Sequence, residues 1–246
     1  MFKLLSVELL KIRRSLALFM MVGIPLLVVA FNVLIVVKRY DLPALNVKQW
    51  AEFRMNVSGL WCYFMMPLYI ALVTGLLNGL EHKNQTWRLM FTLPVAPWAL
   101  YAVKALLAWL FVVGACVVLV AGYVAAALLL GLAGAGNMQA AFDPAPFKLL
   151  ATVSLASLPI VVIQHAVSWR FQNLVLPLAL GVIATMGILQ IGSSKYWIYY
   201  PWSYAMMAAH GSDGAMQQKA LLLSLGVAAL LFAVSTFVLG RRETEV

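Results

Sequence analysis

Charged residues are scarce in this sequence. Asp, Glu, Lys and Arg make up 10% of the 246 residues, whereas 64% are hydrophobic, and the mean hydropathy is +0.95. A soluble core cannot absorb that much apolar surface, so the composition predicts an integral membrane protein. The apolar runs are continuous and do not alternate with polar residues, which favours an all-α membrane fold over a β-barrel.

Several chemical motifs are missing as well. No G-x-x-x-x-G-K-[ST] motif occurs, so the sequence has no P-loop for ATP. No Asp or Glu lies inside an expected span, which disfavours a proton- or ion-coupled carrier. His82, His165 and His210 are scattered without metal-ligand spacing. Cys62 and Cys116 fall inside expected spans, where we expect buried thiols and neither a disulfide nor a metal site.

The excess of basic residues does not indicate nucleic acid. There are 17 Lys and Arg residues against 8 Asp and Glu, but they lie in short flanks between apolar runs. That placement is typical of contact with anionic lipid headgroups. The distribution of basic flanks also favours placing both termini in the cytoplasm.

Six apolar stretches are each long enough to cross a bilayer once as a helix. These expected spans are residues 15–37, 58–80, 104–130, 148–168, 173–192 and 218–240. We expect a polar loop over Lys38–Asn56 and a Gly/Ala-rich loop after about residue 130. The simplest organisation is a single membrane domain over residues 1–246.

Residues 1–14 are expected to form an amphipathic helix lying on the membrane surface. Its apolar face would consist of Phe2, Leu5, Leu9 and Ile12. Its basic residues would meet lipid headgroups: Lys3, Lys11, Arg13 and Arg14.

The segment from Glu81 to Lys104 contains the densest local chemistry in the sequence. Asn84 can cap a short helix, and Pro94 would end it. Pro97 suits the first turn of the following helix, where its missing N–H is not needed. The apolar face of the short helix would be formed by Trp87, Met90 and Phe91. Spacing alone leaves two interpretations open: an element that receives motion from a soluble partner, or a loop that rests on headgroups.

Two further features concern motion and the membrane surface. Pro67 lies near the middle of the second span and indicates either a static kink or a flexing helix. Gly75 and Gly79 would let another helix approach closely. The stretch Gly192–Met216 crowds Tyr and Trp around Pro201, which indicates an aromatic belt or, as we prefer for its length, a re-entrant or interfacial hairpin.

Four sequence segments together point to a known family. They are ELLKIRR near the start, Trp61 with MMPL before the glycines, LEHKNQTWRLMFTLPVAPWALYAVK in the centre, and KYWIYYPWSYAM before the last span. In this order they resemble the permease subunit of ABC-2-type ATP-binding-cassette exporters, and most closely the group of lantibiotic-immunity and bacitracin-resistance permeases. The resemblance extends over essentially the whole chain, although the four basic residues in the loop after the first span are more than the family pattern suggests.

The resemblance implies a partner set and a location. We expect a second permease copy or sister subunit, membrane lipids, and a pair of cytoplasmic ATPase subunits that bind ATP and Mg²⁺, with no cofactor in this chain. The location would be the bacterial cytoplasmic membrane, crossed several times. The aromatic stretch would be an outer hairpin, and the central segment a cytoplasmic coupling helix.

The resemblance also implies roles for individual residues. The contact with the ATPase would be made by Glu81, Lys83, Asn84, Gln85, Thr86, Trp87, Arg88 and Leu89. The translocation path and subunit interface would involve Pro67, Gly75, Gly79 and Pro177. The outer gate would be shaped by Trp197, Tyr200, Pro201 and Trp202.

The leading hypothesis is therefore an export permease that uses ATP hydrolysed by another subunit to move an amphipathic or hydrophobic cargo, such as a peptide antibiotic, drug or lipid-like compound. One alternative is a membrane scaffold or sensor that does not transport and is regulated by an ATPase partner. Another is a membrane enzyme that combines His165 with Ser157, Ser168 or Ser193, although no nucleophile motif supports it.

Overall fold

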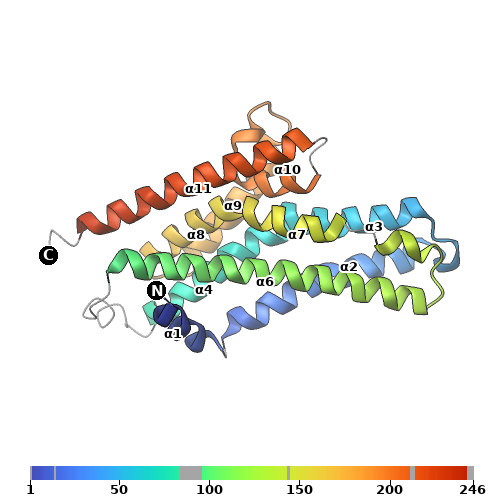
Figure 1. Cartoon of the computed structure of the whole chain (residues 1–246), viewed down its shortest axis with the longest axis horizontal. Helices are drawn as coiled ribbons and strands as arrows, with labels where there is room; N and C mark the ends of the chain where they lie inside the picture. Colours follow the sequence, from blue (N-terminus) through green and yellow to red (C-terminus); the bar gives the residue numbers. More distant parts are fainter. Residues whose placement is uncertain (1, 14, 84–95, 143–144, 211–213, 243–246) are drawn as a thin grey trace.

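The computed structural model describes residues 2–13, 15–83, 96–142, 145–210 and 214–242, and these residues are helical with no strand. The long helices lie side by side as an elongated bundle (Figure 1). The longer helices are α1 (Phe2–Ile12), α2 (Leu16–Arg39), α3 (Val47–Leu60), α4 (Met66–Lys83), α6 (Pro97–Leu132), α7 (Ala145–Ala156), α8 (Leu158–Arg170), α9 (Val175–Ile191) and α11 (Gly214–Arg242). The shorter elements are η1 (Leu42–Ala44), η2 (Trp61–Met65), η3 (Met138–Phe142), η4 (Trp197–Tyr199), η5 (Pro201–Ser203) and α10 (Tyr204–His210).

Four helical stretches in the described residues are long and apolar enough to cross a membrane. They are Leu16–Arg39, Val47–Glu81, Pro97–Leu132 and Gly214–Val238. This finding agrees with the all-helical membrane architecture expected from the sequence. The expected span 173–192 appears as the shorter apolar helix α9, and the expected span 148–168 is divided between α7 and α8.

The prediction of a loop over Lys38–Asn56 was wrong from Val47 onwards. Helix α3 already begins at Val47, because Asn46 and Gln49 form a reciprocal capping box at its start. The Asn46 side chain accepts from the Gln49 backbone N–H, and the Gln49 side chain accepts from the Asn46 N–H. Two backbone donors are thereby satisfied, which stabilises a helix start that hydropathy does not reveal.

Pro67 is the second residue of α4 and lies two residues after the π-helical segment η2, which joins α3 to α4. There the Met66 N–H reaches back five residues to the Trp61 carbonyl. A π-helical turn lets the backbone pass a proline, which cannot donate a hydrogen bond itself. The feature expected as a kink is therefore a local change of helix type.

The break between α7 and α8 follows from Pro159. A proline at this position cannot donate to the carbonyl four residues earlier, that of Leu155. The Leu155 carbonyl instead accepts from the Ser224 hydroxyl of α11, at 2.8 Å. The third helix thus supplies the hydrogen bond that the proline removes, and the chain resumes as α8.

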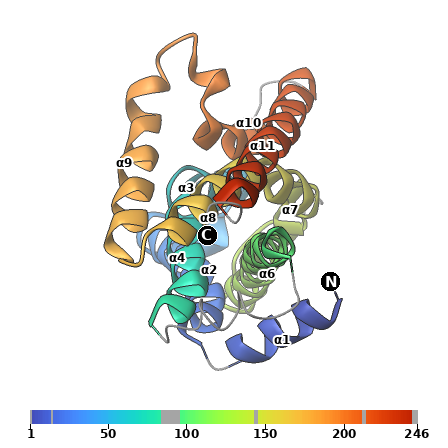
Figure 2. The same cartoon turned by 90° about the vertical axis from the view of Figure 1, so that its left-hand side faces the viewer.

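Helix α1 lies at one end of the bundle. Figure 2, which looks along the bundle, shows α1 lying crosswise to α6. Figure 1 places the C-terminal end of α11 at this same end. Here α4 ends and α6 begins, so α1 lies close to both flanks of the chain segment that connects them.

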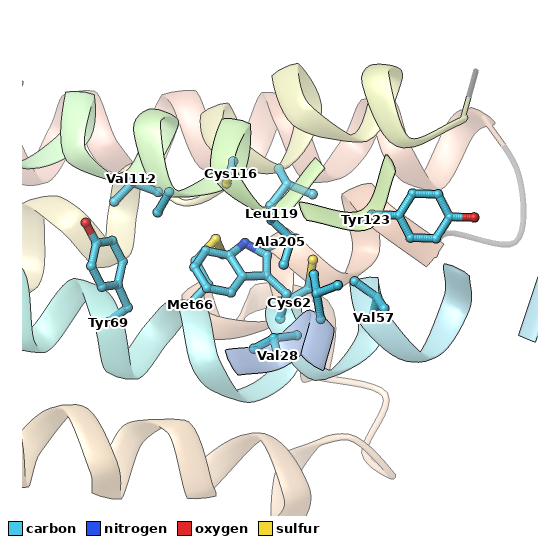
Figure 3. Close-up of a cluster of buried hydrophobic side chains, with 14 of the residues drawn as sticks. Val28, Val57, Cys62, Met66, Tyr69, Val112, Cys116, Leu119, Tyr123 and Ala205 are labelled. Atoms are coloured by element: carbon cyan, nitrogen blue, oxygen red, sulfur yellow. The ribbon is translucent and has the colours of Figure 1, made fainter. Parts of the chain in front are cut away.

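The core lies where α6 packs against α2 and α4, and where α4 packs against α8; α10 closes it from the side of α7 and α11. Figure 3 shows part of this core, with Cys62, Met66 and Tyr69 from one side facing Cys116 and Leu119 of α6. Both cysteines are buried free thiols, as the sequence predicted. This shared core fixes the positions of the helix ends that form the site described next.

Candidate functional site

Four charged side chains form a buried ion cluster at the end of the bundle that holds α1. Lys104 Nζ lies 2.6 Å from Glu8 Oε2 and 3.2 Å from Glu81 Oε1. Lys11 Nζ lies 2.7 Å from Glu8 Oε1 and 2.9 Å from Glu81 Oε1. Each ammonium therefore donates to both carboxylates, and the cluster is formally neutral.

The four side chains of the ion cluster come from three helices, with Glu8 and Lys11 both on α1. Glu8 lies on the inward face of α1, one turn from the buried Ile12. Glu81 lies in the last turn of α4, and Lys104 lies two turns inside α6. Segments that are far apart in the sequence thus meet at one point.

Burial makes the pairing within the ion cluster necessary. Glu8, Glu81 and Lys104 are 2%, 3% and 2% exposed, and an unpaired charge at such a depth is very costly. Lys11 is more accessible, on a helix outside the spanning segments. Burial alone would lower the pKa of its ammonium, but hydrogen bonds to Glu8 and Glu81 and the attraction of their charges raise this pKa overall.

The ion cluster can act as a joint between three helices. Residues 84–95 leave α4 shortly after Glu81 and enter α6 shortly before Lys104. Both flanks of that segment are therefore bonded to each other and to α1. A displacement of either flank has to move the other flank and α1, or separate charges that have no water to replace the lost partner.

Most of the residues predicted to contact an ATPase lie outside the described part of the chain. These are Asn84, Gln85, Thr86, Trp87, Arg88 and Leu89. Lys83 ends α4. Glu81 lies within the described residues, and its carboxylate forms ion pairs with Lys11 and Lys104 of the same chain. Its contact with a partner stays a prediction.

The residues predicted for the path and interface lie on α4 and α9. Pro67 and Pro177 are buried, Pro177 within the first turn of α9, where a proline is tolerated. A Cβ at Gly75 would clash with Leu174 Cδ1 at the start of α9, so this glycine permits a close contact there. Gly79 has open space around it, with nothing within 4 Å of such a Cβ.

The residues predicted for the outer gate come together against α9. Tyr200 donates to the Ala184 carbonyl and its ring stacks on Trp202, with centroids 5.6 Å apart. Pro201 begins the short turn that carries the buried Trp202. Trp197 lines a cavity of about 390 Å³ with Tyr63 of η2 and the end of α9.

His165 is committed to structural hydrogen bonds. Asn78 Nδ2 donates to His165 Nδ1 at 3.1 Å, and His165 Nε2 lies 3.2 Å from the Tyr101 carbonyl. Asn78 also donates to the Ser168 hydroxyl, at 2.7 Å. Both ring nitrogens therefore have partners that tie α8 to α4 and α6, which favours the interpretation as a core histidine.

The sequence analysis missed Glu8 and Lys104 and misread Lys11. Lys11 was expected to meet lipid headgroups, whereas it bonds to Glu8 and Glu81. Leu9, expected on one apolar face with Phe2, Leu5 and Ile12, is 47% exposed, whereas Glu8 and Ile12 are buried against the bundle. The available signal was the pair of opposite charges, Glu8 beside apolar residues and Lys104 inside an apolar helix, each requiring a partner.

Comparison with known proteins places this architecture in a family. No curated protein and no solved structure matches the chain. A family model described as "ABC-2 family transporter protein" matches residues 4–188, which include most of α1 and all four residues of the ion cluster. The match covers well over half of the sequence, and the chain therefore belongs to the ABC-2 family of transporter proteins.

Proposed function

We propose that this chain is the permease subunit of an ATP-binding-cassette exporter and that its ion cluster transmits motion from the ATPase to the spanning helices. Membership in the ABC-2 family supports a membrane permease with an ABC ATPase as its partner. The role of the ion cluster, the cargo and the arrangement of subunits are the new parts of the proposal.

The observation that carries the coupling role is the bonding of both flanks of residues 84–95 to α1. In the proposed mechanism, this segment is the cytoplasmic coupling helix and Trp87 and Arg88 contact the ATPase. Closure of the ATPase pushes the segment. The push passes through Glu81 to α4 and through Lys104 to α6, so the helices move as rigid bodies and reorient the path.

The proposed cargo is amphipathic or hydrophobic. Among the described residues, the buried Asp, Glu, Lys and Arg side chains are Glu8, Glu81 and Lys104, and all three are neutralised within the ion cluster. The interior between the helices therefore offers an incoming solute no ring of charges. Peptide antibiotics, drugs and lipid-like compounds have the matching chemistry.

In the proposed assembly, six passes place both termini in the cytoplasm of a bacterium, with α7 and α8 together forming one pass and α9 another. A second permease copy or a sister subunit would lie against α4 and α9. Helix α9 buries one stripe through Pro177 and Gly181 and leaves Ile183 and Leu189 72% exposed. Two ATPase subunits would bind ATP and Mg²⁺ below the ion cluster, and the aromatic segment around Pro201 would act as the outer gate.

The test uses the complex of permease and ATPase reconstituted in vesicles. We expect Trp87→Ala and Arg88→Ala to abolish the stimulation of ATP hydrolysis by an amphipathic peptide while the complex still assembles. Arg170→Ala, at the end of α8, is the control for the loss of one arginine elsewhere in the chain. Unchanged stimulation in an intact complex would contradict the coupling role of the segment.

A transport measurement in the same vesicles distinguishes export from the role of a non-transporting scaffold or sensor. A fluorescently labelled amphipathic peptide should cross the vesicle membrane only in the presence of ATP. Nucleotide hydrolysis without movement of the peptide would favour the scaffold.

A further inference from the structure

A groove of about 730 Å³ lies between α1, α2 and α6, on the side of α1 that the ion cluster does not use. One face of α1, together with Arg13 directly after it, forms the first wall, which includes Leu9. Leu18 and Met21 of α2 and Leu110 and Gly114 of α6 contribute to the other walls. Its volume lies in the range of small-molecule sites in proteins.

Polar and apolar groups are separated within this groove. Its polar lining residues are Ser6 of α1 and Arg13 directly after α1, on the wall that also carries Leu9, whereas every lining residue from α2 and α6 is apolar. Helix α1 is amphipathic and lies crosswise to the spanning helices (Figure 2). The polar wall therefore lies at the level of headgroups and the apolar walls continue towards the hydrocarbon region.

Arg13 is the cation of this groove. It is exposed, and no carboxylate within the described residues pairs with its guanidinium. By contrast, Lys11, two residues earlier, is bonded to two carboxylates. A guanidinium binds phosphate through two parallel hydrogen bonds. The guanidinium of Arg13 can therefore bind the phosphate group of a lipid.

We propose that this groove is a binding site for one anionic phospholipid, with the phosphate on Arg13 and an acyl chain along α2 and α6. The net charge of +9 favours an anionic over a zwitterionic lipid. The separation of polar and apolar walls matches the separation of headgroup and acyl chain. This site does not depend on the proposed coupling mechanism; it requires only that the chain lies in a membrane.

Gly114 keeps the deep end of the groove open. A Cβ at this position would come within 2.7 Å of Met21 Sδ, so a larger side chain has to displace Met21 into the groove. The groove can therefore be filled from α6 without any change to Arg13. That allows the acyl-chain part and the phosphate part of the site to be tested separately.

The experiment measures lipid adducts on the purified full-length chain by native mass spectrometry after partial delipidation. The probes are phosphatidylglycerol and phosphatidylcholine with identical acyl chains. We expect the wild type to retain phosphatidylglycerol preferentially. Arg13→Gln should lower its retention about fivefold, the effect of one basic residue near the headgroups, and leave phosphatidylcholine unchanged.

Matched variants separate the site from the general membrane surface. Arg170→Gln removes another exposed arginine and should change neither adduct. Gly114→Leu should lower both adducts, because it fills the groove. Leu10→Glu, at an exposed lining residue of α1, places a carboxylate one turn before Arg13 and should lower phosphatidylglycerol more than phosphatidylcholine. This variant still tests the site if Gly114→Leu does not fold.

Three outcomes would overturn the proposal. One is equal retention of the two lipids by the wild type. Another is identical behaviour of Arg13→Gln and Arg170→Gln. The third is displacement of phosphatidylglycerol by soluble glycerophosphate, which would identify a site for free phosphate and not for a lipid.

Discussion

At the scale of single residues, Lys104 shows how the ion cluster offsets the cost of burying a charge. Its ammonium is 2% exposed and donates to Glu8 and Glu81. Removal of an ammonium from water costs several kcal/mol, which is offset only by close pairing. The pairing therefore makes each member of the ion cluster depend on the others, and α1 is held in place by charge as well as by apolar contact.

Replacement of Lys104 by Met should destabilise the protein by about 3–5 kcal/mol, because two carboxylates then share the half-exposed Lys11. The measurement is thermal unfolding in detergent. Lys48→Met, at an exposed lysine, is the control and should have little effect. Adding Glu8→Gln and Glu81→Gln to Lys104→Met should recover part of the lost stability, since neutral groups then replace the unpaired charges; no recovery would contradict an electrostatic cause.

The effect of Lys11→Met on the free energy of unfolding should not depend on pH near neutrality. The pKa of Lys11 is raised in the folded protein. The contribution of its charge to stability is therefore complete below the pKa of about 10.4 in the unfolded state, and is lost only as the pH rises through the higher pKa of the folded state. We expect a constant difference in stability between wild type and variant from about pH 6 to about pH 9. Unfolding curves across this range provide the check, and a difference that shrinks before about pH 9 would count against the assignment.

At the scale of helices, small residues decide how closely α4 and α9 pack. A Cβ at Gly181 would lie 2.5 Å from the Ala71 Cβ and 3.1 Å from Gln164 Nε2. In a membrane, helices associate through such close packing because lipid supplies no hydrophobic driving force between them. Helix α9 is attached by a narrow stripe of buried residues, so its position is sensitive to this contact.

Gly181→Ala should therefore destabilise the protein by about 1–3 kcal/mol, because the added methyl group forces α4 and α9 apart. Gly79→Ala makes the same chemical change where there is open space, and should be neutral or slightly stabilising for a helix. Unfolding of both variants in detergent compares the two glycines directly. Equal destabilisation would show that helix packing is not the cause.

At the scale of the whole molecule, α1 and the C-terminal end of α11 lie at one end of the bundle (Figure 1). The ion cluster lies at this end, whereas the aromatic segment around Pro201 packs against the far part of α9. Helix α6, with 36 residues, is about 54 Å long and exceeds the hydrocarbon thickness. The molecule therefore has an apolar body with the buried ion cluster at one end.

A labelling experiment tests the proposed orientation. Cysteines introduced in place of Trp87 and Arg241 should react with an impermeant maleimide only from the cytoplasmic side, and one at Lys195 only from outside. The native Cys62 and Cys116 are buried, so their background labelling should be low. Labelling of Trp87→Cys from outside would overturn both the topology and the coupling role.

Much of the fold follows from properties that lie within single segments. Hydropathy indicated the main helices, because each must satisfy its backbone hydrogen bonds internally in lipid. Pro97 was correctly placed in the first turn of α6. Hydropathy could not locate the start of α3, since a capping box at Asn46 determines it. It also could not reveal that the Leu155 carbonyl left free by Pro159 is satisfied by Ser224 on a distant helix.

The sequence by itself determined that this protein is a helical membrane protein with an amphipathic first helix and a polar segment after Glu81. Only the tertiary structure decided which charges meet. Glu8, Glu81 and Lys104 are separated by up to 96 positions in the chain, and no local pattern pairs them. They come together because α1, α4 and α6 pack at one end of the bundle, where an unpaired buried charge would be too costly to remain.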